Sequence, residues 1–600
     1  MLEFTSAGTP IVLAPGTSVQ LEYNSPLFDE EALKGNFSYA LGVPAEDNGP
    51  VYGFPELPAN AQAAPSQLPA ELSQDGYTLL RGVQNVTGVN TRRYTVGVIG
   101  GLNALAAAMD GRKLHEFQYG GKREVPLYEE TSPGFFRPGI IGHANATVQN
   151  PEAFDYVFAP LHNPGFFDTT LPDPNCFVNP WVYSDIDFLG QPAGGTFIYR
   201  IPFSVPGGSQ ALPDQPPMCA FPYVHYVLTS IFRELGFVVD TADMLAGEMR
   251  TLVVAGNACL PSLNSISFVQ SFYLADVLPD VTVAEFLKVL RDDFGLVVVL
   301  TPRGTVRTVY CRDVLGSPDY VDLTHVATPA PEKTISTPKG VTLAYRADSE
   351  DVSAKDLGKG FEGQVVGDPV TLLSELPTTA PVTLDAFGRP KLPEPQIRLV
   401  VEKDAYYKSK ARYFLGEPST ALDWEFFGLN YRPLDVNGGG TRQEQGHATT
   451  RMKRVDFDLV GRQTGLFPHM SQRGFQVGGE GTRSTAVRLL FYRGLQPLAT
   501  PGQVYPMLDA HNRNLAGQQT GTLSLRLDGE AGTYKQFLRE WLQVKLNPVV
   551  VKDLWALPPD VLAQFDFTRK VMVDGVQYLV RKISATAPVT KASKVDLSRV

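Results

Sequence analysis

The sequence predicts a β-rich α+β protein of several domains that contains one helix–hairpin α/β unit. At 600 residues the chain is too long for a single hydrophobic core, because domains usually have roughly 100–200 residues. Gly (55) and Pro (48) are spread along the whole chain, which is typical of many short strands joined by turns. Segments in which apolar and polar residues alternate recur from the N-terminus onward, and such alternation predicts strands.

We expect five segments along the chain. They are an N-terminal β-domain (1–118), an extended segment rich in aromatic residues, Pro and Gly (119–215), an α/β helix-hairpin domain (216–330), a mixed β-domain (331–475) and a C-terminal β-domain with a short helix (476–600).

The N-terminal β-domain is predicted from alternation at Val19–Tyr23, Tyr77–Val83 and Arg93–Ile99. Between these strands, residues 55–72 are rich in Pro, Ala and Gln, and we expect an exposed excursion there.

Two helices are predicted in the α/β domain. Apolar residues from Val224 to Leu235 follow the helical period, and Gly236 is a typical helix end. The second helix begins at Thr282, where Glu285 completes a capping box. Apolar strands at 296–300 and 306–310 follow, joined by a turn, and predict a hairpin packed on this helix.

The C-terminal domain has the clearest hairpin signal. Asp574-Gly575 separates two apolar strands and fits a type I′ turn. Before it, apolar residues from Tyr534 to Leu542 predict a short helix.

Aromatic residues crowd between Pro and Gly in segment 119–215. Exposed rings at this density would favour association, so we expect them to be buried against a neighbouring subunit or against another domain of the same chain. The candidates for a subunit interface are Phe135, Phe136, Tyr156, Phe158, Phe166, Phe167 and Trp181.

Composition excludes some function classes. The formal net charge of −11 argues against a surface that coats nucleic acid. It is compatible with an acidic channel through which DNA slides, and equally with simple solubility. The four cysteines are far apart and are expected to be free buried thiols. We see no signal peptide and no apolar stretch long enough to span a membrane, and we expect synthesis in the bacterial cytoplasm.

No motif predicts catalysis, a metal or a cofactor. The eight histidines lack metal-ligand spacing, and the phosphate-loop, dinucleotide and nucleophile-elbow patterns are absent. The carboxylate pairs Asp185 with Asp187 and Asp292 with Asp293 are expected in solvated loops. The segment Asp168–Asp173 offers oxygen ligands for Ca²⁺ but lacks the spacing of a calcium loop. We therefore expect a protein that is not an enzyme.

Five stretches occur in the same order as in one known family. They are Glu22–Phe28 with Gly35–Tyr39 and Val43–Asn48, Phe154–Asn163 with Val178–Trp181, the helix that follows Phe221–Tyr223, Val281–Leu287 with Phe294–Leu296, and Trp541–Lys582. In these patterns of aromatic, Pro and Gly positions the chain resembles baseplate hub or tail-tip structural proteins of tailed phages and prophages of Bacteroidetes-type bacteria. Residues 331–530 contribute little to the resemblance.

The resemblance implies a virion subunit with small β-barrel-like hub domains, repeated around the tail axis as a homotrimer or hexamer. Such a ring joins the tail tube and distal tail proteins to a central spike or fibre, contributes to host attachment, and leaves a channel for genome ejection. DNA would be a partner only in transit, and no catalytic residue transfers. The resemblance is equally compatible with a subunit of a related contractile injection apparatus.

Two other functions remain open at this point. A carbohydrate- or receptor-binding module of the tail or cell surface predicts that Trp181, Trp424 or Trp555 faces solvent in a shallow groove, whereas the hub interpretation buries these rings. A wall-degrading tail hydrolase predicts opposed carboxylates in a cleft.

Overall fold

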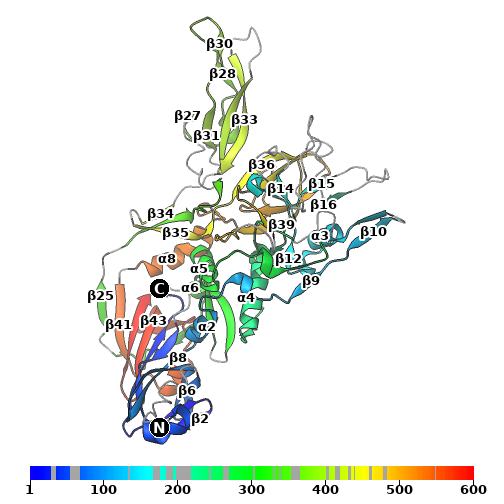
Figure 1. Ribbon diagram of the computed structural model, residues 1–600. Helices are drawn as coiled ribbons and strands as arrows, with labels where there is room; N and C mark the ends of the chain where they lie inside the picture. Colours follow the sequence, from blue (N-terminus) through cyan, green and yellow to red (C-terminus); the bar gives the residue numbers. More distant parts are fainter. Residues whose placement is uncertain are drawn as a thin grey trace.

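The computed structural model covers the 600 residues of the chain (Figure 1). It describes all of them except 29–34, 54–67, 133–134, 167–175, 184–193, 198–217, 242–244, 261–268, 302–303, 329–330, 336, 338, 353–364, 401–404, 413–418, 430–433, 438–439, 458–462, 477–482 and 548.

The largest sheet has fourteen strands and joins the first and last parts of the chain. Its main path runs β2-β1-β6-β7-β8-β4-β3-β43-β44-β41-β25, with β5 paired to β8 and with β42 joining β24 to β43. The strands are β1 (Leu2–Ser6), β2 (Thr9–Ile11), β3 (Val19–Asn24), β4 (Asn36–Ser38), β5 (Leu41–Pro44), β6 (Pro69–Gln74), β7 (Tyr77–Val89), β8 (Arg93–Gly100), β24 (Tyr320–Asp322), β25 (Glu332–Ile335), β41 (Val549–Trp555), β42 (Lys570–Val573), β43 (Val576–Ala587) and β44 (Ser593–Arg599).

This terminal sheet is an open half-barrel and contains both terminal strands; in Figure 1 the N-terminus lies at its lower end and the C-terminus higher, near α8. The pairing of β3 with β43 from Val19↔Ala587 to Asn24↔Lys582 joins its two parts. One apolar cluster fills its concave side and includes Leu21 and Ile583, both with no more than 1% of their surface exposed. Short helices pack beside it: α1 (Ala45–Tyr52), α2 (Leu102–Met109) and α9 (Pro559–Ala563).

The helix–hairpin unit forms as the sequence predicts. Helix α4 (Val224–Glu234) ends before Gly236, which has a φ of 85°. Helix α5 (Val283–Phe294) begins with the capping box of Thr282 and Glu285 and ends at Gly295 in the left-handed conformation. Strands β22 (Leu296–Leu300) and β23 (Thr305–Tyr310) pair as a hairpin, and β18 (Val238–Val239) adds to β23 in parallel.

The central body surrounds this unit with short sheets and one large core. Its other elements are β9 (Lys122–Glu124), α3 (Gly139–Gln149), β12 (Tyr156–Val157), β13 (Leu161–His162), β14 (Phe177–Val178), β15 (Trp181–Tyr183), β16 (Gly195–Phe197), β17 (Phe221–Pro222), β19 (Leu252–Val254), β20 (Ala258–Cys259), β21 (Ser271–Tyr273), α6 (Cys311–Gly316), β26 (Val341–Arg346), β34 (Leu434–Val436), β35 (Thr441–Ala448), β36 (Arg451–Phe457), β37 (Gln463–His469), β38 (Phe475–Gln476), β39 (Leu489–Pro497), β40 (Val504–Asp509), the π-helix η10 (Tyr534–Leu538) and α8 (Arg539–Lys545).

Two projections leave the body in Figure 1. One is the hairpin of β10 (Tyr128–Ser132) and β11 (Phe135–Pro138). The other is longer, and we call it the arm (residues 365–429). Its sheet is ordered β27-β31-β32-β33-β28, and the small hairpin β29–β30 forms its far end. The arm strands are β27 (Val365–Val366), β28 (Thr379–Pro381), β29 (Thr383–Leu384), β30 (Pro390–Lys391), β31 (Gln396–Val400), β32 (Ala405–Arg412) and β33 (Ser419–Leu429).

The arm has its own small core. Ile397 and Val400 are fully buried, yet neither belongs to the apolar clusters of the body or of the terminal sheet. The β-rich α+β fold with several packing units is therefore as the sequence predicts, whereas the ends of the five predicted segments stay predictions.

Candidate functional site

The strand β25 is an open edge of the terminal sheet. It pairs with β41 from Glu332↔Lys552 to Ile335↔Val549, and the part of the chain that the structure describes places no strand on its other side. All four of its side chains are exposed, and Ile335 is 75% exposed. An exposed edge presents a row of backbone N–H and C=O groups on which another chain can pair.

A buried ionic group fixes the segment after β26 to the body. Arg488, which precedes β39, contacts Asp348 at 2.9 Å and Asp351 at 2.5 Å, and all three side chains are at most 2% exposed. Arg488 also donates to the carbonyl of Thr449. A buried guanidinium needs such partners, because an unpaired buried charge is costly. This group therefore fixes the residues that directly follow β26.

A second buried group ties β39 to two other parts of the body. Arg493 pairs with Glu248, and its Nη2 donates to the carbonyls of His511 and Leu523, each at 2.6 Å. Burial alone would raise the pKa of the Glu248 carboxyl. Hydrogen bonds from Thr522 and the ion pair with Arg493 outweigh burial and hold this pKa below its usual range. This group serves as a structural tie.

Asp293 corrects one expectation from the sequence. Asp292 and Asp293 were predicted in a solvated loop, but both lie on α5 and Asp293 is fully buried. Its carboxylate contacts Nδ1 of His447, which lies 154 residues further along on β35. Burial raises the pKa of Asp292 to about 6. The prediction was wrong because the partner that makes burial tolerable comes from a distant strand.

Two further histidines meet in the interior. The rings of His162 on β13 and His469 on β37 are stacked, and their Nδ1 atoms are 2.7 Å apart. One ring must donate to the other, which requires the accepting ring to be neutral at Nδ1. Burial lowers the pKa of His469 to about 2, in keeping with a structural pair.

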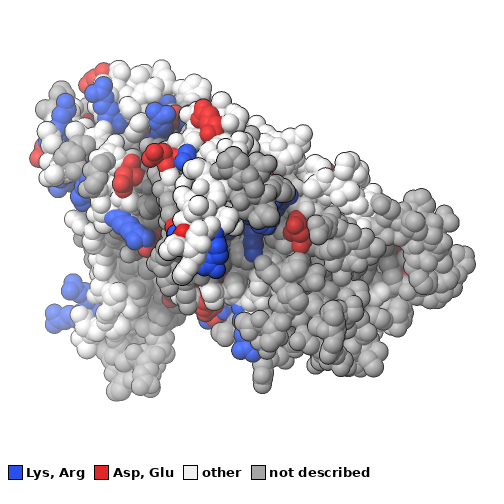
Figure 2. Space-filling model, turned by 90° about the horizontal axis from the view of Figure 1, so that it is seen from above, with Lys and Arg blue, Asp and Glu red and all other residues white. Residues whose placement is uncertain are grey.

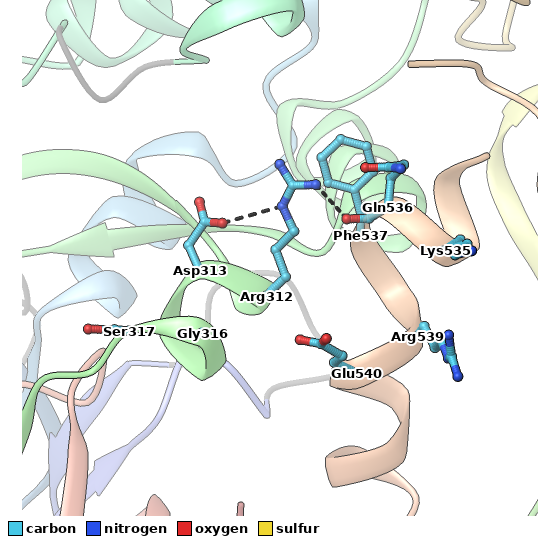
Figure 3. Close-up of a pocket in the computed structure, with 9 residues that line it drawn as sticks. All are labelled: Arg312, Asp313, Gly316, Ser317, Lys535, Gln536, Phe537, Arg539 and Glu540. Carbon is cyan, nitrogen blue, oxygen red and sulfur yellow. Dashed lines mark hydrogen bonds and ion pairs between the residues drawn. The ribbon is translucent and has the colours of Figure 1, made fainter. Parts of the chain in front are cut away.

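A surface pocket of about 460 Å³ lies between α6 and the helices η10 and α8 (Figure 3). On its wall, Arg312 donates to the carbonyl of Gln536 at 2.5 Å, lies 3.3 Å from Asp313 and covers the ring of Phe537 at 4.2 Å. Its other charged residues are Asp313, Lys535, Arg539 and Glu540. The pocket suits polar contacts with a ligand or partner.

The other candidates for chemistry fall into three groups. Among the described residues, no three His, Cys, Asp or Glu side chains gather as metal ligands. The segment Asp168–Asp173 and the pair Asp185 with Asp187 lie outside the described residues. All four cysteines are free and buried, as predicted.

No helix in the described part of the chain is long and apolar enough to cross a membrane.

The structure describes the side chains of four of the seven predicted interface aromatics. Tyr156, Phe158 and Trp181 are buried in the body core, and Phe166 is partly buried against it. Phe135 and Phe136 belong to β11, and Phe167 lies outside the described residues. A role for these seven residues between subunits stays a prediction.

The tryptophans test the carbohydrate-binding alternative. Trp181 is 5% exposed and Trp555 is fully buried, and the indole of Trp424 is partly buried and donates to the carbonyl of Pro377. Trp181 and Trp555 therefore do not face solvent as that alternative requires, whereas Trp424 is partly exposed.

The charged groups of the face shown in Figure 2 are mixed. There, Lys and Arg side chains lie among Asp and Glu side chains. Among the described residues of this face, the Lys and Arg side chains form no continuous basic stripe of the kind that tracks a nucleic-acid backbone.

These features define a β-rich multidomain protein with an open sheet edge and a projecting arm. No family model matches the chain, and no curated protein matches it. Among solved structures, the crystal structure of the prophage MuSo2 43 kDa tail protein from Shewanella oneidensis aligns with the chain at 7% sequence identity and a TM-score of 0.29. The alignment covers 100% of this chain and 98% of that chain. A likeness of this strength carries no argument about this chain.

Proposed function

We propose that this protein is a structural subunit of a phage tail tip or baseplate hub, which assembles with copies of itself around the tail axis. In this role it connects the tail tube to a central spike or fibre in the virion and surrounds a channel through which DNA passes. A homotrimer is the expected ring, and a hexamer is the alternative.

The observation that carries the proposal is the open edge at β25. Edge strands are usually kept short and charged, and Glu332 and Lys333 charge the first half of β25, but its last residue leaves an apolar side chain exposed on the open edge. Here Ile335 is one of the most exposed large apolar residues of the described chain. Pairing with a second copy would satisfy the edge and cover this side chain. The ordered resemblance to hub proteins supports the same conclusion.

The test is the mass of the full-length protein in solution, measured by light scattering at several concentrations. We expect a trimer or hexamer whose fraction rises with concentration. Ile335→Lys should shift the protein toward the monomer, because a charge placed on an edge strand opposes pairing.

Val238→Lys is the matched control, because Val238 is 68% exposed on the short strand β18, away from this edge. It should leave the mass unchanged. A strict monomer at every concentration would contradict self-assembly, and equal effects of the two variants would contradict the role of β25.

A further inference from the structure

The far end of the arm displays apolar side chains to solvent. Leu384 is 67% exposed, Phe387 is 81% exposed and Leu392 is 47% exposed, and all three belong to the hairpin β29–β30 or directly follow it. In Figure 1 this hairpin is the part of the arm farthest from the terminal sheet. We call residues 382–394 the arm tip.

The arm tip is held in one shape by its own hydrogen bonds. The Asp385 carboxylate accepts from the backbone N–H groups of Phe387 and Arg389, each at 2.8 Å, and from Nε of Arg389 at 3.0 Å. Gly388, with a φ of 73°, donates to the carbonyl of Asp385 and completes the turn. The backbone hydrogen bond from Arg389 is the main reason why the pKa of Asp385 lies below its usual range. Phe387 is thus presented on an ordered turn, which lowers the entropy lost when a partner binds.

The charges of the arm tip indicate what can cover it. It carries two acids, Asp385 and Glu394, and two bases, Arg389 and Lys391, so its formal charge is zero. Asp385 and Arg389 pair with each other within the tip, at 3.0 Å, so the complementary charges that a second copy can meet are those of Lys391 and Glu394. The arm tip has no excess of positive charge to attract an anionic membrane, and a membrane would have to accommodate the Asp385 carboxylate beside Phe387.

We propose that the arm tip is a second contact between copies of this chain, in which Phe387 and Leu384 of neighbouring subunits pack on one another. This inference rests on the proposed self-assembly and adds a contact distant from β25. Aromatic residues at the centre of an interface commonly contribute most to binding.

The experiment uses the full-length Phe387→Cys variant. The four native cysteines are buried, so an added exposed thiol is the one that reacts. The variant is mildly oxidised with oxidised glutathione. Two of the introduced thiols, from neighbouring copies, form one disulfide while oxidised glutathione is reduced to two glutathione molecules. We expect a covalent dimer on a non-reducing gel. Val12→Cys, at a residue 51% exposed beside β2, is the matched control and should remain monomeric on the gel.

Light scattering on Phe387→Asp completes the test, and we expect its half-assembly concentration to rise at least about tenfold. An assembly that persists unchanged in Phe387→Asp, with no cross-link in Phe387→Cys, would overturn the arm-tip contact and leave the proposed function standing. A wild-type protein that is monomeric throughout would overturn both. If the wild-type protein floats with vesicles of phosphatidylcholine and phosphatidylglycerol, Phe387→Asp does not, and Phe387→Cys gives no cross-link, the tip binds membranes and the arm-tip contact is overturned.

Discussion

Arg488 and Asp351 form a 2.5 Å ion pair in the interior, with 2% and 1% of their side chains exposed. They are 137 residues apart in sequence. Asp348 shares the same guanidinium. The segment that follows β26 is therefore held in the body by one buried cation.

Replacing Arg488 by Met should lower the free energy of unfolding by about 3–5 kcal/mol, because two carboxylates lose their buried counter-ion. Urea unfolding followed by tryptophan fluorescence measures this. Arg81→Met is the control: Arg81 pairs with Glu71 but its side chain is 74% exposed, so the loss should stay within about 1 kcal/mol. Equal losses in the two variants would show that the buried group adds nothing beyond a surface pair.

His225 should make stability depend on pH. Burial, with a smaller contribution from Arg250, lowers its pKa to about 4 from an ordinary value of 6.5. Between these values the unfolded chain binds a proton that the folded chain does not, so this group reduces stability as pH falls from 6.5 to 4, by about 1.4 kcal/mol per pH unit. His225→Gln should flatten the slope of unfolding free energy against pH in this window. The same substitution at the exposed His325 should not, and an unchanged slope in His225→Gln would contradict the prediction.

Gly82→Ala should destabilise the terminal sheet. Gly82 is paired with Gly100 across β7 and β8, and a Cβ atom at Gly82 would lie 1.9 Å from the carbonyl oxygen of Ile99. The backbone must move to admit it, at a cost of about 1–3 kcal/mol or more. Thermal unfolding measures the loss. Gly316→Ala, where no atom lies within 4 Å of the added Cβ, should change the midpoint little, and the prediction fails if both variants melt together.

The cap of α5 should contribute about 1 kcal/mol. Thr282 accepts from the backbone N–H of Glu285, and the Glu285 carboxylate accepts from the N–H of Thr282. Thr282→Ala removes the first bond and should lower the unfolding free energy by about that amount, whereas Thr282→Ser retains it. Chemical denaturation of the two variants distinguishes them. A Ser variant as unstable as the Ala variant would show that the methyl group, not the hydroxyl, matters.

Local signals in the sequence predicted local structure well. The capping box, the helix end at Gly236 and the Asp574-Gly575 turn each depend on residues within one turn of one another. Helix α3 was missed because Gly139 and Gly142 weaken the helical pattern and no capping side chain precedes it. Tertiary packing of residues such as Ile140 stabilises it instead.

Contacts between distant residues could not be predicted. Nothing near Asp293 in the sequence indicates His447, and nothing near Arg488 indicates Asp348 and Asp351. The sequence likewise contains no local sign that β3 pairs with β43. The candidate site was missed for the same reason, because β25 is an edge only by virtue of the order of strands in the whole sheet.

The register of β3 against β43 has a consequence for synthesis on the ribosome. Val19 pairs with Ala587, so at roughly 10 residues per second about a minute separates the emergence of the two partners. During that interval β3 has one edge with no native neighbour, and the nascent N-terminal strands cannot complete their sheet. Translation speed and chaperone access during this minute should therefore influence the yield of folded protein.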